Sequence, residues 1–495
     1  MAVPPPTPSA AGRRLKINMG AISPCGKFEG RRVPMSYTQK LADYVAELKY
    51  KELPEEVIQQ AKMITLHTVG VALASYPTLQ AKKAIALAKA WGGGPKESTL
   101  YGDGTKVSSV NAAFANGTMA DILDWEDCSW TGHGSANAIP GGLALAEAIG
   151  ASGKEYLLSV VAGWEAYQRI ADAVQPSENW GFLKKGWGLT SWEIYAAAMP
   201  AAKLLRLGRS KMNQVIGIAG ALTPIVNAKV HKTLTDFYHY QHGFTCRDGL
   251  AAALVAHRGI DTLYDMLDGE EDGYWCTISD QCDWEAYTRN LGTDFTIMRT
   301  LVKHWPVNLW IQTPMDNLDA MVKAHGFKAD QIAEILVSPQ FEHRMGYRPG
   351  GFESIAEAEF SIPYCLAAYL YDPRPGPNWY TKKNLRDRKI LDLAARIKGT
   401  GPSQGLQASV SMLKQGSFPE VTLKVTLKDG REFTNALRFP KGHPKNRMTE
   451  EEYTDRFRRA ASFALKPKKI EQAITLFLNL ENVKDMSAVG RVLHG

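Results

Sequence analysis

The sequence predicts a mostly α-helical protein whose C-terminal half contains a smaller part of mixed helices and strands. Its 495 residues exceed what one hydrophobic core ordinarily organises, so two domains are expected. Apolar residues recur at helical spacing through most of residues 36–298. Strand patterns appear only later, at Ile335–Val337 and in the alternating run Val421–Phe433, where Asp429 and Gly430 form a predicted hairpin turn.

The helices are predicted from residue spacing and from the breaks between them. Apolar side chains recur every three or four positions over residues 36–74, where Pro54 suits the first turn of a second helix. Three glycines at 92–94 end the next helix. A helix over Val110–Leu123 leads into an acidic loop, and a helix rich in small residues is expected to start near Pro140. Later helices are predicted over Leu143–Ile149, Glu155–Val174, Glu193–Leu207, Lys211–Thr223, Leu250–Arg258, Ala356–Tyr371, Met448–Leu465 and Ile470–Leu480.

Residues 1–35 have the composition of a tail. Three prolines at 4–6 and the small residues at 9–12 disfavour regular structure. Several basic residues and no acid before Glu29 are compatible with a mitochondrial transit peptide, although no amphipathic helix is evident. A disordered extension of a cytoplasmic protein is the alternative, and a cytoplasmic location is the expectation.

The composition argues against several classes of function. The net charge of +7 is spread along the chain without a long basic tract, so a nucleic-acid role has little support. No apolar run of about 18 residues is free of charges and helix breakers, so no transmembrane helix is expected. The 6 cysteines include no CxxC pair, which gives no zinc, iron–sulfur or disulfide pattern and favours a reducing compartment.

The densest group of reactive side chains lies within Asn116–Ala148. Carboxylates, tryptophans and one histidine crowd a short loop: Asp121, Asp124, Glu126, Asp127, Trp125, Trp130 and His133. A carboxylate and an imidazole on one loop can act as base and acid when their surroundings separate their pKa values. A solvated acidic turn with an incidental histidine is the alternative. The interleaved tryptophans favour a cleft over a free surface.

A second group of reactive side chains lies within His231–Asp248. His239 and His242 are three residues apart, which places them on one face of a helix. No metal-binding signature accompanies them, so no metal site is expected. Protonated histidines and Arg247 favour the binding of carboxylates. Tyr238 could donate a proton if its pKa were lowered, and a core tyrosine is the alternative.

Both groups resemble segments of the MmgE/PrpD family, which includes 2-methylcitrate dehydratase, cis-aconitate decarboxylase and an iminodisuccinate epimerase. The run NGTMADILDWEDCSWTGHGS resembles the family's Asp-aromatic-x-Asp motif and loop histidine, so Asp124 and His133 match two active-site positions. The run YHYQHGFTCRDGL resembles a second family pattern, in which His242 and Arg247 are kept. Lys303 matches a lysine near the start of the family's second domain.

The chain departs from the decarboxylases of that family at three polar active-site positions. Trp187, Tyr238 and Asn308 stand where those enzymes carry a histidine, a lysine and a histidine. Trp187 is expected either to stack on a substrate or to be a core tryptophan. These replacements remove both proton donors and positive charge from the three positions, so they weigh against decarboxylation.

The resemblance covers roughly residues 36–492 and implies the domain organisation. It implies a helical domain over residues 36–298, an α+β lid domain over 299–445 inserted before the C-terminal helices, and a return to the helical domain over 446–495. It also implies a homodimer and a reaction that needs no cofactor.

These observations predict a cofactor-independent hydro-lyase of the 2-methylcitrate dehydratase type, acting on a citrate-like tricarboxylate. Asp124 and His133 would transfer protons, with base and acid unassigned, and Lys303 would meet the negative charge of the transition state. The expected substrate pocket consists of Trp187, Tyr238, His239, His242 and Arg247. Decarboxylation of a cis-aconitate-like substrate, epimerisation beside a carboxylate, and a non-enzymatic helical interaction protein remain alternatives.

Overall fold

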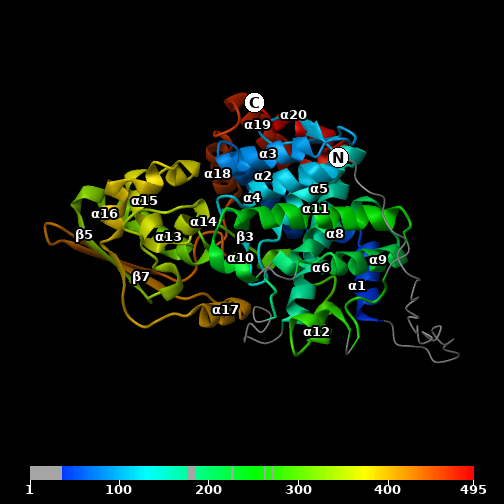
Figure 1. Cartoon of the computed structure of the whole chain (residues 1–495), viewed down its shortest axis with the longest axis horizontal. Coiled ribbons are helices and arrows are strands. Elements are labelled where there is room, and N and C mark those ends of the chain that lie inside the picture. Colours follow the sequence, from blue (N-terminus) through cyan, green and yellow to red (C-terminus); the bar gives the residue numbers. More distant parts are fainter. Residues whose placement is uncertain (1–35, 176–184, 189, 225–227, 261–262, 270–271) are drawn as a thin grey trace, which may run out of the picture. The chain divides into compact units, whose positions relative to one another are not determined.

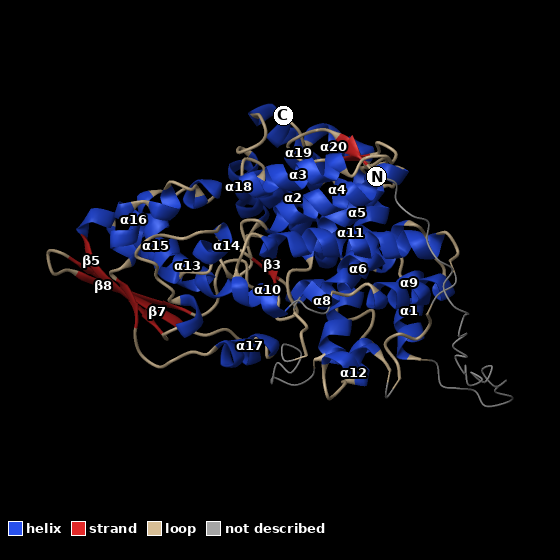
Figure 2. Ribbon diagram, in the orientation of Figure 1, coloured by secondary structure: helices blue, strands red, loops and turns tan. Residues whose placement is uncertain are grey.

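A computed structural model describes residues 36–175, 185–188, 190–224, 228–260, 263–269 and 272–495. The predicted tail at 1–35 and part of the predicted loop at 180–192 lie outside the described residues. The described chain is mostly helical with a small sheet region, as Figures 1 and 2 show, so the predicted fold class is confirmed. Residues 36–495 pack as one unit, and the domain boundaries proposed from the sequence stay predictions.

Five helices form the centre of the helical part: α4 (Ser109–Asp121), α5 (Ser135–Ile149), α6 (Gly153–Val174), α8 (Thr190–Leu204) and α11 (Phe237–His257). Helix α11 packs against α4 and α8 and runs across the middle of this part in Figure 1. Small residues permit the close approach. A Cβ on Gly243 of α11 would lie 2.0 Å from the Thr118 hydroxyl of α4, so only glycine fits there.

Further helices cover this centre. They are α1 (Tyr37–Glu47), α2 (Glu55–Ser75), α3 (Leu79–Ala90), α9 (Arg209–Ala221), α10 (Ala228–Thr233), α12 (Tyr274–Ile278), α18 (Glu450–Ala461), α19 (Pro467–Leu478) and α20 (Ser487–Val492). Helices α18 and α19 pack against α2, so the C-terminal segment returns to the helical part. None of the described helices is both long and apolar enough to cross a bilayer.

The mixed region contains a four-stranded sheet in the order β6-β5-β7-β8. Its strands are β5 (Ile332–Ser338), β6 (Ile397–Gly399), β7 (Val421–Leu427) and β8 (Glu432–Leu437). Strand β5 pairs parallel with β6 and antiparallel with β7, and the predicted turn at Asp429 and Gly430 joins β7 to β8. Alternate residues of β7, from Val421 to Leu427, are buried, as its period-two pattern predicts.

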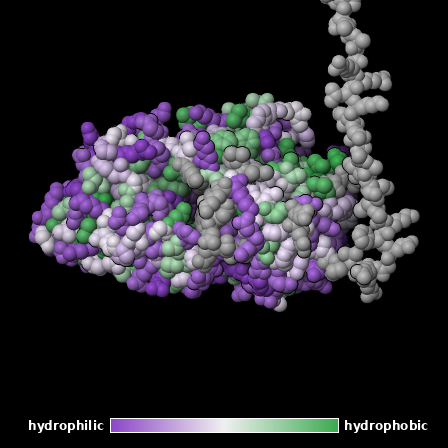
Figure 3. All heavy atoms as spheres, turned by 60° about the horizontal axis from the view of Figure 1, so that its bottom comes forward, coloured by the Kyte–Doolittle hydropathy of each residue, from purple (hydrophilic) through white to green (hydrophobic). Residues whose placement is uncertain are grey.

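Helices of the mixed region cover the sheet and connect its strands. They are α13 (Gln312–His325), α14 (Ile355–Glu359), α15 (Ile362–Tyr371), α16 (Arg388–Ala394) and α17 (Leu406–Lys414). Helix α13 packs on β7 and β8, and α15 packs on β6. Figure 2 shows α13 and α15 on the same side of the sheet. On the face drawn in Figure 3, hydrophilic residues surround smaller apolar areas.

Two predicted helices differ from those observed. Helix α5 begins at Ser135 rather than near Pro140, because the Asp127 carboxylate accepts a hydrogen bond (2.9 Å) from the Ser135 amide and so satisfies its first turn. The predicted helix over Ala356–Tyr371 is two helices, α14 and α15. Ser361 caps the second of them, and Pro363 in its first turn has no amide to continue the ladder of α14.

Candidate active site

A two-stranded ladder brings together two segments that are far apart in the sequence. Strand β3 (Asp127–Cys128) pairs antiparallel with β4 (Leu301–Val302). One residue beyond this ladder, the Lys303 amide donates to the Glu126 carbonyl at 3.0 Å. The backbone therefore fixes Lys303 beside the acidic loop before any side-chain contact is considered.

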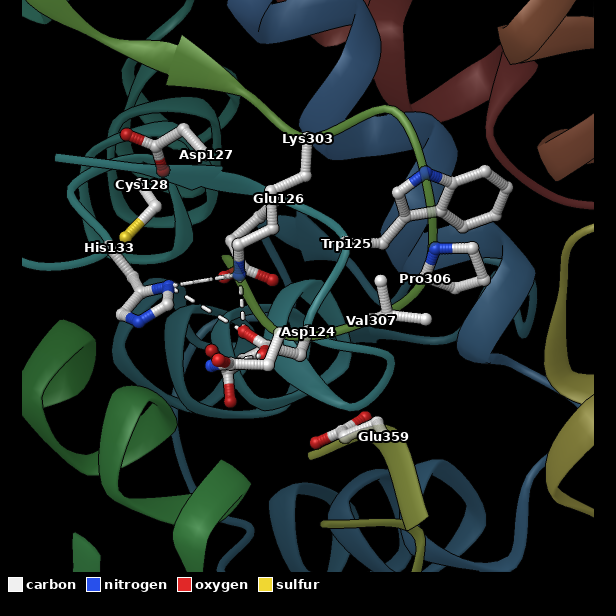
Figure 4. A network of polar contacts seen from close by, with 12 residues as sticks. Asp124, Trp125, Glu126, Asp127, Cys128, His133, Lys303, Pro306, Val307 and Glu359 are labelled. Atoms are coloured by element: carbon white, nitrogen blue, oxygen red, sulfur yellow. Dashed lines mark hydrogen bonds and ion pairs between the residues drawn. The ribbon is translucent and has the colours of Figure 1, made fainter. Parts of the chain in front are cut away.

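The Lys303 ammonium lies at the centre of a buried cluster (Figure 4). It donates to the carboxylates of Asp124 and Glu126, the latter at 2.7 Å, and lies 3.3 Å from Nδ1 of His133. That ring nitrogen is also hydrogen-bonded to the Glu126 carboxylate. Lys303, Asp124 and Glu126 are fully buried and His133 is 3% exposed. The structure thus brings together the three residues expected to carry catalysis and adds Glu126.

The backbone of Asp124 holds an uncommon conformation. Its φ of 43° lies in the left-handed region, which few residues other than glycine adopt. The turn closes with a hydrogen bond of 2.8 Å from the Asp124 amide to the Asp121 carbonyl. The Asn308 side chain donates to the second carboxylate oxygen of Asp124 at 3.2 Å. The Asp124 carboxylate is therefore held from both sides by groups from the mixed region, Lys303 and Asn308.

Charge, more than burial, sets the protonation of this cluster. Burial and the Lys303 charge oppose protonation of His133, but Glu126 and Asp124 outweigh them and raise its pKa to about 9. Burial likewise disfavours the Lys303 ammonium, yet Asp124 and Glu126 raise its pKa above the ordinary value. At neutral pH the cluster therefore holds an imidazolium and an ammonium against carboxylates.

Hydrogen bonds to neighbouring helices position the loop that carries His133. Its amide donates to the Glu193 carboxylate of α8 at 2.7 Å. The Glu193 carboxylate also accepts from Asn137 of α5 at 3.0 Å. Gly134 leaves room for Tyr167, whose ring carbon would lie 2.7 Å from an added Cβ. The histidine is thus held both by its backbone and by the contact of its ring with Glu126.

Behind His133 lies a chain of alternating carboxyl and imidazole groups. Nδ1 of His239 is 2.8 Å from Asp121, and Nε2 of His242 is 3.2 Å from the same carboxylate. His242 reaches Glu193 with Nδ1 at 3.1 Å, and His239 reaches Glu359 with Nε2 at 3.3 Å. The two histidines do share one face of α11, as their spacing predicts. Both contact protein carboxylates, and their predicted contact with substrate stays a prediction.

Glu359, at the end of α14, is the member of this chain with the fewest contacts. It is fully buried, and neither carboxyl oxygen has a hydrogen-bond partner among the described residues. Burial raises its pKa well above the usual range, and the charges of Asp124 and Asp121 add to the shift. Figure 4 shows Glu359 facing Asp124 from the opposite side of the cluster. Its surroundings therefore favour the protonated form of this carboxyl group.

Two of the predicted pocket residues, Tyr238 and Trp187, are buried among aromatic side chains. Tyr238 is buried against Phe360 and beside His239, and burial together with the charge of Asp124 raises its pKa, so the suggestion that it donates a proton through a lowered pKa is wrong. Trp187 packs edge-on against Tyr274, at 5.3 Å between ring centres, in the apolar core.

Arg247 is not brought to the cluster. Its guanidinium pairs with Asp248 at 2.7 Å and lies over the rings of Phe244 and Trp91, and the side chain is 30% exposed. Its predicted role in holding a substrate carboxylate has no support from this placement. The physical reason is that Arg247 lies beside Phe244 of α11 and Trp91, which follows α3, rather than on the face of α11 that carries the two histidines.

A different arginine, Arg344, lies beside the cluster. Its Nε donates to the Asn308 side chain at 2.7 Å, and its guanidinium lies 4.6 Å from the centre of the Phe360 ring. Burial lowers its pKa to about 10, which leaves it a cation at neutral pH. Asn308 thereby links Arg344 to Asp124. No pattern around Arg344 could have indicated this role, because its neighbours in the cluster come from distant segments.

Comparison with known proteins agrees with the two-part organisation of the site. A model of the MmgE/PrpD N-terminal domain matches residues 39–286, and one of the MmgE/PrpD C-terminal domain matches residues 305–482. The chain belongs to the MmgE/PrpD family.

Several curated relatives of this MmgE/PrpD protein are cis-aconitate decarboxylases. The chain is 22% identical to the one from Aspergillus terreus, with 92% of this chain and 96% of the relative covered. It is 24% identical to that of Mus musculus, over 93% of this chain and 94% of the relative. It is 25% identical to that of Homo sapiens, over 93% and 95%. The family assignment rests on the two domain models rather than on these identities.

One group of residues in this MmgE/PrpD chain has the composition of a metal site. Ligand atoms of Asp121, Asp124, Glu126 and His133 all lie within 4.8 Å of one another. The Lys303 ammonium contacts three of these four side chains and pairs with the carboxylates of two of them, Asp124 and Glu126. A divalent ion there would meet a buried positive charge, so these residues fit an internal cation better than a metal.

Proposed function

We propose that this protein is a cofactor-independent lyase that eliminates water from a citrate-like tricarboxylate, as 2-methylcitrate dehydratase does. The observation that carries the proposal is the buried cluster of Asp124, His133 and Lys303, in which a carboxylate base and an imidazolium acid flank one ammonium. Elimination beside a carboxylate needs these three functions together.

In the proposed reaction Asp124 removes the proton next to a substrate carboxylate. The electron pair of that C–H bond forms a carbon–carbon double bond as the bond to the hydroxyl breaks. His133 supplies the proton that turns the departing hydroxide into water. Lys303 stabilises the negative charge that accumulates on the substrate carboxylate in the transition state. The products are an unsaturated acid and water, and no oxidant or cofactor is needed.

Two further cluster residues would hold the substrate. Arg344 offers a guanidinium from the mixed region, which suits a second carboxylate. The neutral Glu359 would donate a hydrogen bond to a third. The cluster is closed to solvent, so the substrate would enter as the mixed region opens, and closure would exclude water. The predicted contacts of Trp187, Tyr238, His239 and His242 remain part of this proposal.

Decarboxylation of a cis-aconitate-like substrate is the second candidate, favoured by the relatives named above. In that reaction the bond to a carboxylate carbon breaks, carbon dioxide leaves, and His133 protonates the carbon. Asp124 would then have no proton to remove. Epimerisation beside a carboxylate would use Asp124 and His133 on opposite faces of one carbon.

One experiment separates these reactions. The purified protein is incubated with 2-methylcitrate, citrate and cis-aconitate, while ultraviolet absorbance and released carbon dioxide are followed. A rising absorbance without carbon dioxide supports dehydration, and carbon dioxide supports the second candidate. Exchange of substrate hydrogen for solvent deuterium without net reaction indicates epimerisation. If none of these changes occurs with any of the three acids, the lyase proposal fails.

We also propose that the enzyme is a cytoplasmic homodimer that contains the domains predicted from the sequence. Light scattering of the purified chain tests the dimer. Fusion of residues 1–35 to a fluorescent protein tests the alternative mitochondrial location, since a transit peptide would carry the reporter into that organelle.

A further inference from the structure

A cavity lies on the far side of the loop that carries Lys303. It has a volume of about 460 Å³ and is bordered by His304 and Trp305, by α13, by the end of α15 and by α18. Its aromatic walls are Trp125, Trp305 and Tyr369. Figure 4 shows the Trp125 ring directed away from the cluster, whereas Glu126 points into it. The cavity is therefore separate from the candidate active site.

An arginine in the wall of this cavity lacks a partner of opposite charge. Arg456 of α18 is 8% exposed and donates to the backbone carbonyls of Lys303 and His304. Its Nε has no hydrogen-bond partner among the described residues, and no carboxylate in the described part of the chain forms an ion pair with it. Burying a guanidinium group without a partner of opposite charge costs free energy, and a bound anion would offset that cost.

The other charged residues of the cavity leave a net positive charge. Among the described residues Arg459, three positions after Arg456, has no ion pair either. The lining carboxylates are each neutralised: Glu452 by Lys441 at 2.7 Å, Asp455 by Arg458 at 2.8 Å and Asp319 by Lys323 at 2.8 Å. Two uncompensated guanidinium groups therefore face a cavity with aromatic walls.

We propose that this cavity binds a small organic anion that carries a flat ring. The anionic group, a phosphate or a carboxylate, would lie between Arg456 and Arg459, because guanidinium groups form charge-assisted hydrogen bonds with both. The ring would pack against Trp305 and Tyr369, which stand edge to face at 5.4 Å between ring centres. The cavity volume suits a ligand of this size.

The position of the cavity would connect its ligand to the candidate active site. Arg456 holds the carbonyl of Lys303, and the Trp125 indole donates to the carbonyl of His304 at 3.0 Å. An anion bound to Arg456 would therefore affect the backbone segment that positions Lys303. Binding itself needs no turnover and does not depend on the proposed reaction.

The test measures binding to the full chain by tryptophan fluorescence and by titration calorimetry. Two matched pairs of probes separate the ring from the charge: benzoate against cyclohexanecarboxylate, and adenosine monophosphate against ribose 5-phosphate. Inorganic phosphate is the fifth probe. The variants are Arg459→Gln, Arg456→Gln and, as the control for loss of one exposed arginine outside the cavity, Arg447→Gln.

The proposal expects saturable binding of benzoate or adenosine monophosphate, at least tenfold tighter than that of its partner without an aromatic ring. Whichever of the two binds more tightly identifies the carboxylate or the phosphate. Arg459→Gln should weaken binding by about tenfold or more, while Arg447→Gln should leave it unchanged. Arg456→Gln should weaken binding at least as much where the variant folds.

Three outcomes would overturn the proposal. The first is the absence of saturable binding by every probe. The second is equal affinity within both matched pairs, or binding of phosphate as tight as any, since the aromatic walls would then contribute nothing. The third is an equal loss of affinity in Arg459→Gln and Arg447→Gln, which would place any binding outside this cavity. Because Arg459 is exposed, its variant keeps the test decisive even if Arg456→Gln does not fold.

Discussion

The two faces of the loop that contains Asp124, Trp125 and Glu126 differ in how their charged groups are paired. On one face Asp124, Glu126 and His133 surround the Lys303 ammonium, and each charge has a partner of opposite sign. On the other face Trp125 and its aromatic neighbours line a cavity whose wall includes Arg456, a guanidinium with no ion pair in the described part of the chain. Consecutive residues of this loop supply both faces, because the Trp125 ring points away from the cluster into which Glu126 points.

This difference shows that burial alone does not identify a catalytic group. Lys303 and Arg456 are both buried cations, with 0% and 8% exposure. Carboxylates raise the pKa of Lys303, whereas burial and the charge of Arg459 lower the pKa of Arg456 to about 9. The charged groups that neighbour each cation, rather than its degree of burial, determine its pKa and the interactions it can make.

The largest effect is expected from removing the proposed base on the polar face. Asp124→Asn should lower turnover of whichever reaction the assay detects by about two to four orders of magnitude. The matched control is Asp316→Asn, which changes a carboxylate that holds His304 and Trp305 on the aromatic face. The control should retain most of the turnover. Near-normal rates in Asp124→Asn would defeat the assignment of the base.

The next effect concerns stability. Lys303→Met leaves Asp124 and Glu126 buried without their cation, and should lower the free energy of unfolding by about 3–5 kcal/mol. Urea denaturation measures this difference. Lys398→Met, which removes a lysine whose side chain is 62% exposed and pairs with Glu334, should cost no more than about 1 kcal/mol. Equal stability of the two variants would show that the charges of the cluster are not coupled as described.

The third effect is a dependence of stability on pH. His133 has its pKa raised from 6.5 to about 9, so its stabilising contribution is complete below about pH 6.5 and is lost as pH rises through about 9. Its size should be on the order of 2–3 kcal/mol. Denaturation from about pH 6 to about pH 10 should show this loss in the wild type and not in His133→Asn. The same loss in both proteins would assign the titration to another group.

The smallest effect should come from the aromatic face. Trp125→Phe removes the indole hydrogen bond to the His304 carbonyl and should lower the free energy of unfolding by about 1–2 kcal/mol. Turnover should stay close to that of the wild type, because the Trp125 side chain points away from the cluster. A loss of turnover as large as in Asp124→Asn would remove the distinction between the two faces.

Sequence patterns predicted the local parts of this molecule well. The helices around the acidic loop, the hairpin at Gly430 and the shared face of His239 and His242 follow from periodicity and turn chemistry. The first residues of helices were predicted less accurately. Helix α5 is an example, because the group that caps it is the side chain of Asp127, eight residues before Ser135. A cap of this kind is not visible in periodicity.

Prediction of the site was partial for a related reason. Glu126 could have been proposed, since it lies two residues from Asp124 on the same loop. Glu193, Glu359 and Arg344 carried no comparable signal, because they approach the cluster from separate elements. Arg247 was assigned from a family pattern, yet side-chain packing on Phe244 directs it elsewhere.

The sequence by itself determined the mostly helical class, the family and the presence of a carboxylate and an imidazole on one glycine-flanked loop, because these features depend on neighbouring residues. Only the tertiary structure decided that the ammonium of Lys303, 179 positions after Asp124, lies between them, and that Arg456 pairs with no carboxylate among the described residues. The physical reason is that the partner of a buried charge is chosen by chain folding over long distances, and that partner sets the protonation state on which any chemistry depends.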